Sequence, residues 1–203
     1  MDVPVRTKTP QQADKMLDAA GRLFGASRFH EVRMEDIAAE AEVGKGTIYR
    51  YFNDKEELFL ALLERSARQF LDRLKEERAR APCPRKQLQR IVAGIIDFFD
   101  TRPHLLDLIQ RAEVLQDQKG TSPWGNIREE VMELMLDLFK AGRESGDFDI
   151  RDPELSALFI LGALRSIIRF GRQPRPVDLA KRLTDIFLRG ADVSDVTQIT
   201  CRN

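Results

Sequence analysis

Apolar residues recur along this chain at helical spacing from residue 11 to residue 188. In most segments they stand at positions i, i+3, i+4 and i+7, which places them on one face of an α-helix. No segment alternates apolar and polar residues convincingly, as a half-buried strand would. The pattern therefore predicts an all-α fold of about nine helices. We expect these helices near residues 11–24, 34–41, 45–52, 54–79, 88–99, 103–115, 127–145, 155–170 and 176–188.

Two of the short helices, in the segment 33–52, are separated by only Glu42-Val43-Gly44. Ile48 and Phe52 share a face of the second helix, and Val43 offers an apolar side chain to the corner between the two. Two short helices with a shared apolar corner and a tight turn containing Gly form a helix-turn-helix. The apolar face of the first helix consists of Met34, Ile37, Ala38 and Ala41.

The outward face of the second helix carries the candidate chemistry. Arg and Lys side chains contact phosphates or guanine, and a Thr methyl packs against the thymine methyl. A Gly on this face would let the DNA backbone approach closely. The alternative is a solvated face on an ordinary short helix, but the preceding helix, the short turn and the Tyr-Arg-Tyr-Phe run together favour DNA reading. The outward residues are Gly46, Tyr49 and Arg50, flanked by Lys45 and Thr47.

The charge balance makes any electrostatic footprint for DNA a local one. The chain has 203 residues, with 33 Lys and Arg against 33 Asp and Glu, and its formal net charge is zero. A protein that binds nucleic acid through overall charge would be strongly basic. Basic residues instead gather near the helix-turn-helix and near the amino end: Lys45, Arg50 and Lys55, with Arg6, Lys8 and Lys15.

Several other functional classes find little support in the sequence. Cys83 and Cys201 do not form a disulfide framework, and His30 and His104 have no partners at metal-ligand spacing. No apolar run is long enough to span a bilayer, and residues 1–15 contain no apolar core of a signal peptide. We therefore expect a cytoplasmic protein that does not associate with a membrane. An enzyme would need a Gly-rich phosphate loop, a nucleophile elbow or a credible triad, and none is found. A helical interaction module without DNA binding is the stronger rival.

A long helix connects the two parts of the chain that we predict. Asp54 is a good N-cap and Glu57 follows it by three residues, which resembles a capping box. This helix runs to about Ala79, before Pro82-Cys83-Pro84, and is long enough to leave one domain and enter the next. We therefore predict a DNA-binding domain over 1–56 and a larger helical bundle over 57–203.

The carboxyl-terminal helices suggest how two chains would assemble. Asp152 followed by Pro153 is a cap with proline at the first helical position. The helix after it is apolar on more than one side, and Gly162, Ala163 and Ser166 would let another helix approach closely. Such a helix is either central to a monomer's core or covered by a partner. We favour a two-fold dimer made by the last two helices, because a helix-turn-helix usually reads paired half-sites.

The segment from about Lys15 to Leu63 resembles the DNA-binding domain of the TetR family of transcriptional regulators. The likeness covers about a quarter of the chain. It implies an all-helical homodimer that represses transcription from a palindromic double-stranded operator and releases it when a small molecule binds. It also implies that Lys45, Thr47, Tyr49 and Tyr51 lie at the DNA, and that Lys55 meets a phosphate. The residues that carry it are Ala19-Ala20, Leu23-Phe24, Asp36-Ile37-Ala38, Ala41, Val43, Gly46-Thr47-Ile48-Tyr49, Tyr51-Phe52 and Lys55-Glu56-Glu57-Leu58.

Three positions depart from the family pattern. Glu42 stands where the family usually has Gly, and a Glu in a left-handed turn would be mildly strained. Gly44 stands where the family has Ser or Thr, and glycine is tolerated at an N-cap. Arg33 replaces a capping Thr or Ser; it has the reach to contact a phosphate but offers no acceptor, so a weaker helix start is expected.

The larger bundle carries no recognisable motif for its ligand. Its apolar residues are mostly Leu, Ile, Phe and Met, which favours a small, largely apolar effector. We expect no metal and no cofactor. As first candidates for the effector pocket the sequence offers Phe99, Arg111 and Trp124.

Overall fold

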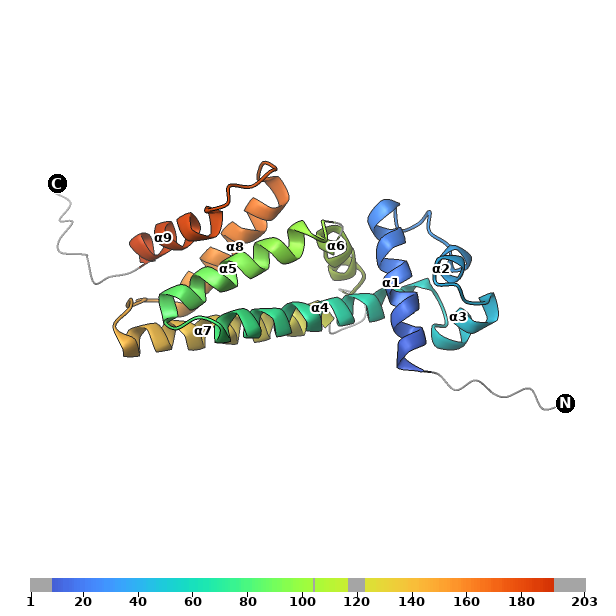
Figure 1. The fold of residues 1–203 in the computed structure, drawn as a ribbon, viewed down its shortest axis with the longest axis horizontal. Coiled ribbons are helices and arrows are strands. Elements are labelled where there is room, and N and C mark those ends of the chain that lie inside the picture. The colour runs from blue at the N-terminus through green and yellow to red at the C-terminus, as the bar shows by residue number, and fades with distance from the viewer. Residues whose placement is uncertain (1–8, 104, 117–122, 192–203) are drawn as a thin grey trace. The chain divides into compact units, whose positions relative to one another are not determined.

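A computed structural model describes residues 9–103, 105–116 and 123–191, with the side chains of 111–116, 123, 124 and 191 left out of the description (Figure 1). Every regular element in this part of the chain is an α-helix, which confirms the predicted all-α class. The elements are α1 (Pro10–Ala26), α2 (Met34–Glu40), α3 (Lys45–Tyr51), α4 (Lys55–Ala79), α5 (Pro84–Asp100), α6 (Leu105–Gln116), α7 (Pro123–Ser145), α8 (Pro153–Phe170) and α9 (Leu179–Ala191).

The chain forms two compact units. The first comprises Met1–Ala67 and Arg102–Trp124, and the second comprises Arg68–Thr101 and Gly125–Asn203. Helix α4 therefore contributes its first half to one unit and its second half to the other. The functional boundary predicted between residues 56 and 57 stays a prediction, because compactness alone divides the chain inside α4.

The core of the first unit is built where α1, α2 and α3 meet the start of α4. The rings of Phe24, Phe29 and Phe59 form a cluster with centroid separations of 5.1, 5.2 and 5.9 Å. Such ring pairs contribute about 0.5–1.5 kcal/mol each beyond their burial. Aliphatic side chains and one methionine complete the core around this cluster: Met16, Ala20, Ile37, Ala38, Ile48, Leu58, Leu62 and Leu63.

One residue in the turn between α2 and α3 has the left-handed backbone conformation that we expected from the sequence. Glu42 has φ of 55°, the left-handed conformation expected at the position where the TetR family pattern has glycine. The amide of Val43 donates to the carbonyl of Ala38 at 2.9 Å, and the amide of Glu42 donates to Ala39 at 3.0 Å. These two bonds make a Schellman motif, which closes α2 and redirects the chain into α3.

Side-chain caps fix the starts of the two helices for which the sequence predicted them. The Asp54 carboxylate accepts the amide of Glu57 at 2.8 Å at the start of α4. The Glu57 carboxylate reaches back to the amide of Asn53 at 2.7 Å, one residue earlier than in a standard capping box. At the start of α8, the Asp152 carboxylate accepts the amide of Leu155 at 3.1 Å.

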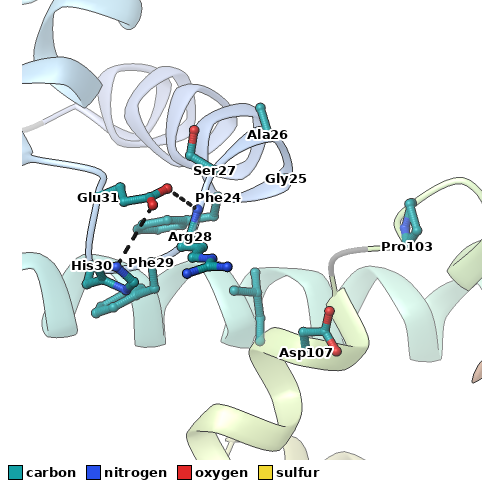
Figure 2. Close-up of a pocket in the computed structure, with 11 residues that line it drawn as sticks. Phe24, Gly25, Ala26, Ser27, Arg28, Phe29, His30, Glu31, Pro103 and Asp107 are labelled. Carbon is teal, nitrogen blue, oxygen red and sulfur yellow. Dashed lines mark hydrogen bonds and ion pairs between the residues drawn. The ribbon is translucent and has the colours of Figure 1, made fainter.

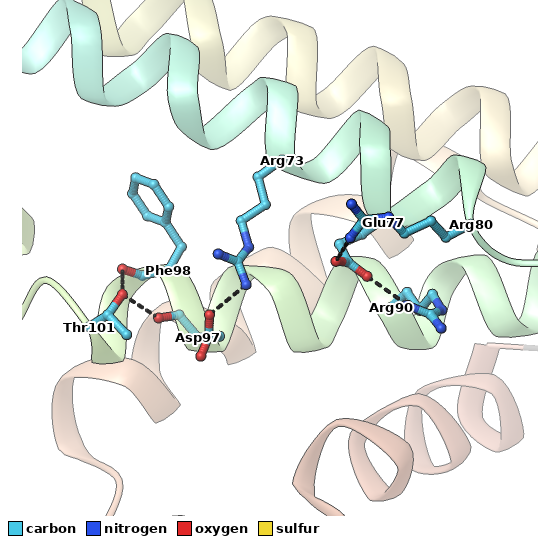
Figure 3. Close-up of polar contacts among 7 residues, drawn as sticks. All are labelled: Arg73, Glu77, Arg80, Arg90, Asp97, Phe98 and Thr101. Carbon is cyan, nitrogen blue, oxygen red and sulfur yellow. Dashed lines mark hydrogen bonds and ion pairs between the residues drawn. The ribbon is translucent and has the colours of Figure 1, made fainter.

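In the second unit, α5 is the central helix, and α8 and α9 both pack against it. Its sequence explains this position, because Leu88, Ile91, Val92 and Ile95 are all buried. Polar contacts join α5 to the second half of α4 (Figure 3). Arg73 Nη2 lies 2.7 Å from Asp97 Oδ2, and Glu77 lies 3.0 Å from Arg80 and from Arg90. The Thr101 hydroxyl then ends α5 by donating to the carbonyls of Asp97 and Phe98 at 2.8 and 3.1 Å.

Several predicted helix limits were wrong. Helix α1 continues to Ala26 rather than ending near Phe24, and α6 begins at Leu105 rather than Pro103. The loop expected to reach Gly125 ends earlier, because α7 starts at Pro123; residues 117–122 lie outside the description. Helix α9 begins at Leu179 rather than Pro176, since the chain first makes a turn in which the Leu179 amide donates to the Pro176 carbonyl at 3.0 Å. Gly190 was expected beyond this helix but lies within it. The buried Thr184, Phe187 and Leu188 hold α9 against its neighbours past the point where local propensity would end it.

Candidate DNA-binding site

Helix α3 is oriented by two buried anchors. Ile48 is fully buried and Phe52, which directly follows the helix, is 7% exposed. The opposite side of the helix therefore faces solvent, and Tyr49 is 40% exposed there, a high value for a large aromatic residue. The structure thus brings together on one exposed surface four of the residues singled out from the sequence: Lys45, Gly46, Tyr49 and Arg50.

Lys45 is held by an acidic residue that the sequence did not single out. Its ammonium lies 2.7 Å from the Glu35 carboxylate, and both side chains are largely exposed. The hydrogen bond from Lys45 lowers the pKa of Glu35, and the same bond raises the pKa of Lys45. Both groups stay charged at neutral pH, so Glu35 competes with any phosphate for this cation.

Gly46 is exposed on the outer surface of α3, whereas Thr47 is only partly exposed. A Cβ added at Gly46 would meet no atom within 4 Å, so nothing in the protein itself requires glycine there. Thr47 is half-buried at the edge of the surface. Gly44 is the N-cap of α3 with φ of −68°, in the ordinary extended region, as predicted for a tolerated cap. A bare helix surface at Gly46 is the geometry that close approach of another backbone needs.

Arg33 stands at the N-cap of α2 and is exposed. Its side chain supplies no cap bond, as its lack of an acceptor predicts. Asp36 compensates in part, since its carboxylate accepts the Arg33 amide at 2.9 Å. Arg33 is therefore an exposed residue at a helix start that the Asp36 carboxylate, and not the Arg33 side chain, caps.

Lys55 is bound into the protein more closely than the sequence indicated. Its ammonium donates to the carbonyls of Phe29 and Val32, each at 2.8 Å. The same ammonium lies 4.5 Å from the centroid of the Phe29 ring. Lys55 thus ties the start of α4 to the segment between α1 and α2. No sequence signal revealed this role, because its partners lie 23 and 26 residues away.

Tyr51, the last residue of α3, points its hydroxyl at the start of α1. The Thr9 amide donates to this hydroxyl at 2.6 Å, and the hydroxyl donates to Gln12 Oε1 at 2.8 Å. The ring is half-buried, and the Arg50 guanidinium lies 5.7 Å from its centroid. The sequence placed Tyr51 beside the buried anchors but gave no sign of the contact with α1.

A pocket of about 830 Å³ lies in the first unit, beside the segment that Lys55 holds (Figure 2). Residues 24–31 form one wall, and Pro103 with Asp107 and Leu108 of α6 form the other. Glu31 accepts the amide of Arg28 at 3.0 Å and lies 3.9 Å from the imidazole of His30. Acidic and basic groups are mixed around the opening, so the lining favours no single ligand charge.

Of the residues suggested for an effector pocket, Phe99 alone has a described side chain. It is 7% exposed and packs at 5.6 Å, between ring centroids, against both Phe70 and Phe98. Its ring therefore belongs to the packed core between α4 and α5. The side chains of Arg111 and Trp124 lie outside the description.

The described residues provide neither a cluster of metal ligands nor a helix suited to a membrane. No group of three or more His, Cys, Asp or Glu side chains in this part of the chain is placed to hold a metal ion. No helix within it combines the length and the apolar character needed to cross a bilayer.

A family of known proteins matches part of the first unit, and individual relatives match larger shares of the chain. The family model described as "Bacterial regulatory proteins, tetR family" matches residues 16–62. The fatty acid metabolism regulator protein of Bacillus subtilis is 23% identical over 121 residues, which cover 60% of this chain and 59% of that regulator. The chain thus spans less than two thirds of that relative's length. The HTH-type transcriptional repressor KstR of Rhodococcus jostii is 27% identical over 176 residues, covering 85% of this chain and 79% of the repressor.

The fold also matches solved structures along most of its length. The transcriptional regulator FadR from Bacillus subtilis, solved in complex with stearoyl-CoA, superposes with a TM-score of 0.70 at 20% identity. The match covers 87% of this chain and 98% of the FadR chain. At 20% identity the similarity shows that the two proteins share the arrangement of their helices, and it does not show that they bind the same ligand.

Proposed function

The chain belongs to the tetR family of bacterial regulatory proteins, and we propose that it is a repressor that binds a palindromic operator as a homodimer. In this proposal a small ligand lowers the affinity for DNA and releases the operator. Such a protein acts in the cytoplasm and catalyses no reaction. The observation that carries the proposal is the exposed surface of α3, held outward by buried Ile48 and Phe52.

This surface has the chemistry that a major groove requires. Arg50 and Lys45 supply cations for phosphates and guanine edges, and Thr47 supplies a methyl group for thymine. Tyr49 adds an exposed ring with a hydroxyl, and Gly46 allows the DNA backbone to come close. Arg33, Tyr51 and Lys55 stand at the margin of the surface, and we expect each to contribute to phosphate binding directly or by holding its neighbours in place.

An exposed apolar stripe on α8 supports the dimer. Ala157, Ile160 and Leu164 point into the second unit, while the opposite side of the helix carries large apolar residues in solvent. Such a stripe on one helix is typical of an interface. A two-fold axis through this stripe would present two copies of α3, as reading of half-sites about 34–36 Å apart requires. The exposed residues are Leu155 (63%), Leu158 (59%), Phe159 (68%) and Phe170 (79%).

The apolar interior of the second unit is an argument for a small and largely apolar effector. Its interior is lined by aromatic and aliphatic side chains such as Phe98, Phe139 and Leu138. The similar FadR structure holds stearoyl-CoA, whose acyl chain is long and apolar although its CoA part is large and charged. Opening a cavity among such residues would provide an apolar ligand with a complementary surface.

The proposal is tested by selecting bound sequences from a library of random duplexes with the full chain. We expect one recovered motif with two inverted half-sites. On that duplex, the variant Lys45→Ala/Tyr49→Ala/Arg50→Ala should bind at least tenfold more weakly, because each lost base contact costs about 1–3 kcal/mol. A matched variant, Lys86→Ala/Lys140→Ala, removes exposed cations from the second unit and should bind as the unmodified chain does. Recovery of no motif would favour the rival reading, a helical interaction module without DNA binding.

A further inference from the structure

One guanidinium in the second unit joins the end of α5 to the end of α8. Arg175 Nε donates to Oδ2 of Asp100, the last residue of α5, at 2.5 Å. The same group donates through Nη1 to the carbonyl of Ile167 at 2.9 Å and through Nη2 to that of Ile168 at 3.1 Å. Both carbonyls belong to the last turn of α8, whose acceptors a helix cannot satisfy by itself. All three nitrogens of this guanidinium are therefore in use.

The contact requires an arginine. A guanidinium is planar and holds its donors in a fixed fork, whereas a lysine ammonium is a compact point charge. The side chain of Arg175 is 8% exposed, so it is held largely away from water. Gly171, which directly follows α8, leaves room for it, because a Cβ at that position would lie 2.6 Å from Arg175 Nη1. Both residues thus suit this one contact.

The contact fixes the connection between α8 and α9. Gln173 Nε2 donates to Asp100 Oδ1 at 3.2 Å, so this segment is bonded to the end of α5 by two side chains, those of Gln173 and Arg175. Phe170, the last residue of α8, is 79% exposed and belongs to the apolar stripe described above. Helix α9 begins at Leu179, four residues after Arg175. The guanidinium therefore sets where the chain leaves one helix and how it enters the next.

The packing of α8 and α9 does not itself depend on this contact. Both helices pack against α5, and their residues Leu164 and Leu188 are each 2% exposed. The Asp100 side chain is 24% exposed, so water can solvate its carboxylate when the guanidinium is removed. We therefore expect loss of the contact to free the connection between the two helices without unfolding the unit.

We propose that Arg175 is a positioning residue for dimer formation: it fixes the Phe170 end of α8 relative to α9, so that the two helices present one preformed surface to a second copy of this chain. The proposal rests on the dimer proposed above and adds the residue that orders its surface. Association costs less when the surface is already ordered, because less conformational entropy is lost on binding. The buried Arg175 side chain acts through the helices that it holds and not by touching the partner.

The test is sedimentation of the full chain over a concentration series, which gives the dissociation constant of the dimer. Arg175→Gln removes the fork and should raise this constant about tenfold or more. Arg172→Gln is the matched control, because Arg172 is exposed in the same segment and its replacement removes the same charge. The control should leave the constant unchanged. An unchanged constant for Arg175→Gln, or equal rises in the two variants, would overturn the proposal.

Two further measurements separate positioning from a role in folding alone. A residue that only stabilises the fold would lower the melting temperature, followed by circular dichroism, without changing the dissociation constant of the folded chain. Phe170→Ala removes the side chain at the end of α8 that the contact is proposed to place. Adding Arg175→Gln to Phe170→Ala should raise the constant by a smaller factor than Arg175→Gln does alone. Fully additive effects would show that Arg175 does not act through this end of α8.

A second variant covers the case in which Arg175→Gln loses its helical signal. Asp100→Asn keeps the bonds of Arg175 to α8 and removes the charged acceptor at the end of α5. It should raise the dissociation constant in the same direction but by a smaller factor, and no rise would overturn the proposal. If the unmodified chain sediments as a monomer at every concentration, the proposed dimer itself fails. A dimer whose affinity is insensitive to Arg175→Gln and Asp100→Asn contradicts this inference alone.

Discussion

The carboxylate of Glu35 on α2 lies 2.7 Å from the ammonium of Lys45 at the start of α3. This ion pair spans the two helices of the helix-turn-helix on their solvent side. Exposed pairs of this kind add little to stability, because water screens them. If Lys45 binds a phosphate, as we propose, the pair has a greater weight in function, because Glu35 occupies that cation.

Replacing Glu35 should therefore strengthen DNA binding. Glu35→Gln leaves Lys45 without its acidic partner and removes a negative charge from the surface that we propose to face DNA. We expect affinity for duplex DNA to rise about two- to fivefold at low salt, with a smaller gain as salt increases. Glu40→Gln is the control, because Glu40 lies on the same helix but pairs with Arg22 at 2.7 Å. Equal gains in the two variants would mean that net charge alone, and not Lys45, is responsible.

The same pair predicts a flat pH response. The folded-state pKa of Glu35 is lowered by Lys45, so its contribution is present above the ordinary Glu pKa and is lost as the pH falls through the lowered value. The pKa of Lys45 is raised by Glu35, so its contribution is present below the ordinary Lys pKa and is lost as the pH rises through the raised value. Between about pH 5 and pH 10 the pair stays charged. DNA affinity of Glu35→Gln relative to the unmodified chain, measured from about pH 6 to pH 9, should keep a constant ratio.

Gly46 offers a substitution whose effects on folding and on binding have opposite signs. A methyl group at this position meets nothing in the protein, and alanine favours a helix over glycine by about 0.5–1 kcal/mol. Gly46→Ala should therefore raise the thermal stability slightly. If the DNA backbone approaches α3 here, the same methyl group should lower the affinity for the selected operator. Thermal melting and anisotropy on one preparation measure both, and undiminished affinity would remove Gly46 from the DNA surface.

The sequence predicted the helix-turn-helix well because its determinants are local. The apolar spacing of Ile37, Ala38 and Ile48 fixes which faces turn inward, and the short break fixes the turn. Even the strained residue was visible, since position 42 requires φ near 55° and carries no glycine. The partners of the surface residues were not visible. Glu35 for Lys45, and Thr9 for Tyr51, come together only through the packing of helices, which no local periodicity encodes.

Lys55 shows the same limit for a single side chain. Its place at the start of α4 favoured a phosphate contact, whereas its ammonium is bonded to the carbonyls of Phe29 and Val32. Lys55→Ala should leave both carbonyls without this partner and cost about 1–3 kcal/mol of unfolding free energy. Chemical denaturation measures the loss, with Lys86→Ala as an exposed control. If Lys55→Ala also lowers the slope of log Kobs for DNA against log salt concentration by about one unit, Lys55 contacts a phosphate in addition to this internal role. An unfolding free energy equal to that of the control would contradict a stabilising role for the bonds to Phe29 and Val32.

The dimer is tested by two neighbouring residues of α8 that face opposite ways. Phe159 is 68% exposed in the single chain, whereas Ile160 is 3% exposed. Phe159→Glu should therefore leave the monomer folded but bury a charge in the interface, which costs several kcal/mol and dissociates the dimer. Ile160→Glu should unfold the chain instead. Sedimentation gives the mass and circular dichroism gives the fold. A Phe159→Glu protein that remains dimeric would place the interface elsewhere.

We expect a ligand in the second unit to act on the first through helix α4, which contributes to both units. In the first unit, Arg65 binds α4 to α1 through Asp14 at 3.3 Å and Asp18 at 2.7 Å. In the second unit, Arg73 and Glu77 bind α4 to α5 (Figure 3). A helix held at both ends passes a displacement of one end to the other. Half-sites about 34–36 Å apart tolerate little change in the spacing of the two α3 helices.

We therefore expect operator DNA and effector to weaken each other by the same factor, because coupling between two binding sites is reciprocal. Stearoyl-CoA, the ligand of the similar FadR structure, is the first compound to try, followed by any compound that raises the melting temperature. Titration calorimetry with and without the operator measures the factor. Glu77→Gln, which loosens the contacts of α4 with α5, should bring this factor closer to one while leaving DNA affinity in the absence of ligand unchanged. The matched variant Glu130→Gln removes the pair of Lys75 with α7 and leaves the α4–α5 contacts in place, so it should keep more of the coupling. If effector affinity were the same with and without operator for the unmodified chain, ligand and DNA would not be coupled, and α4 would have no part in release.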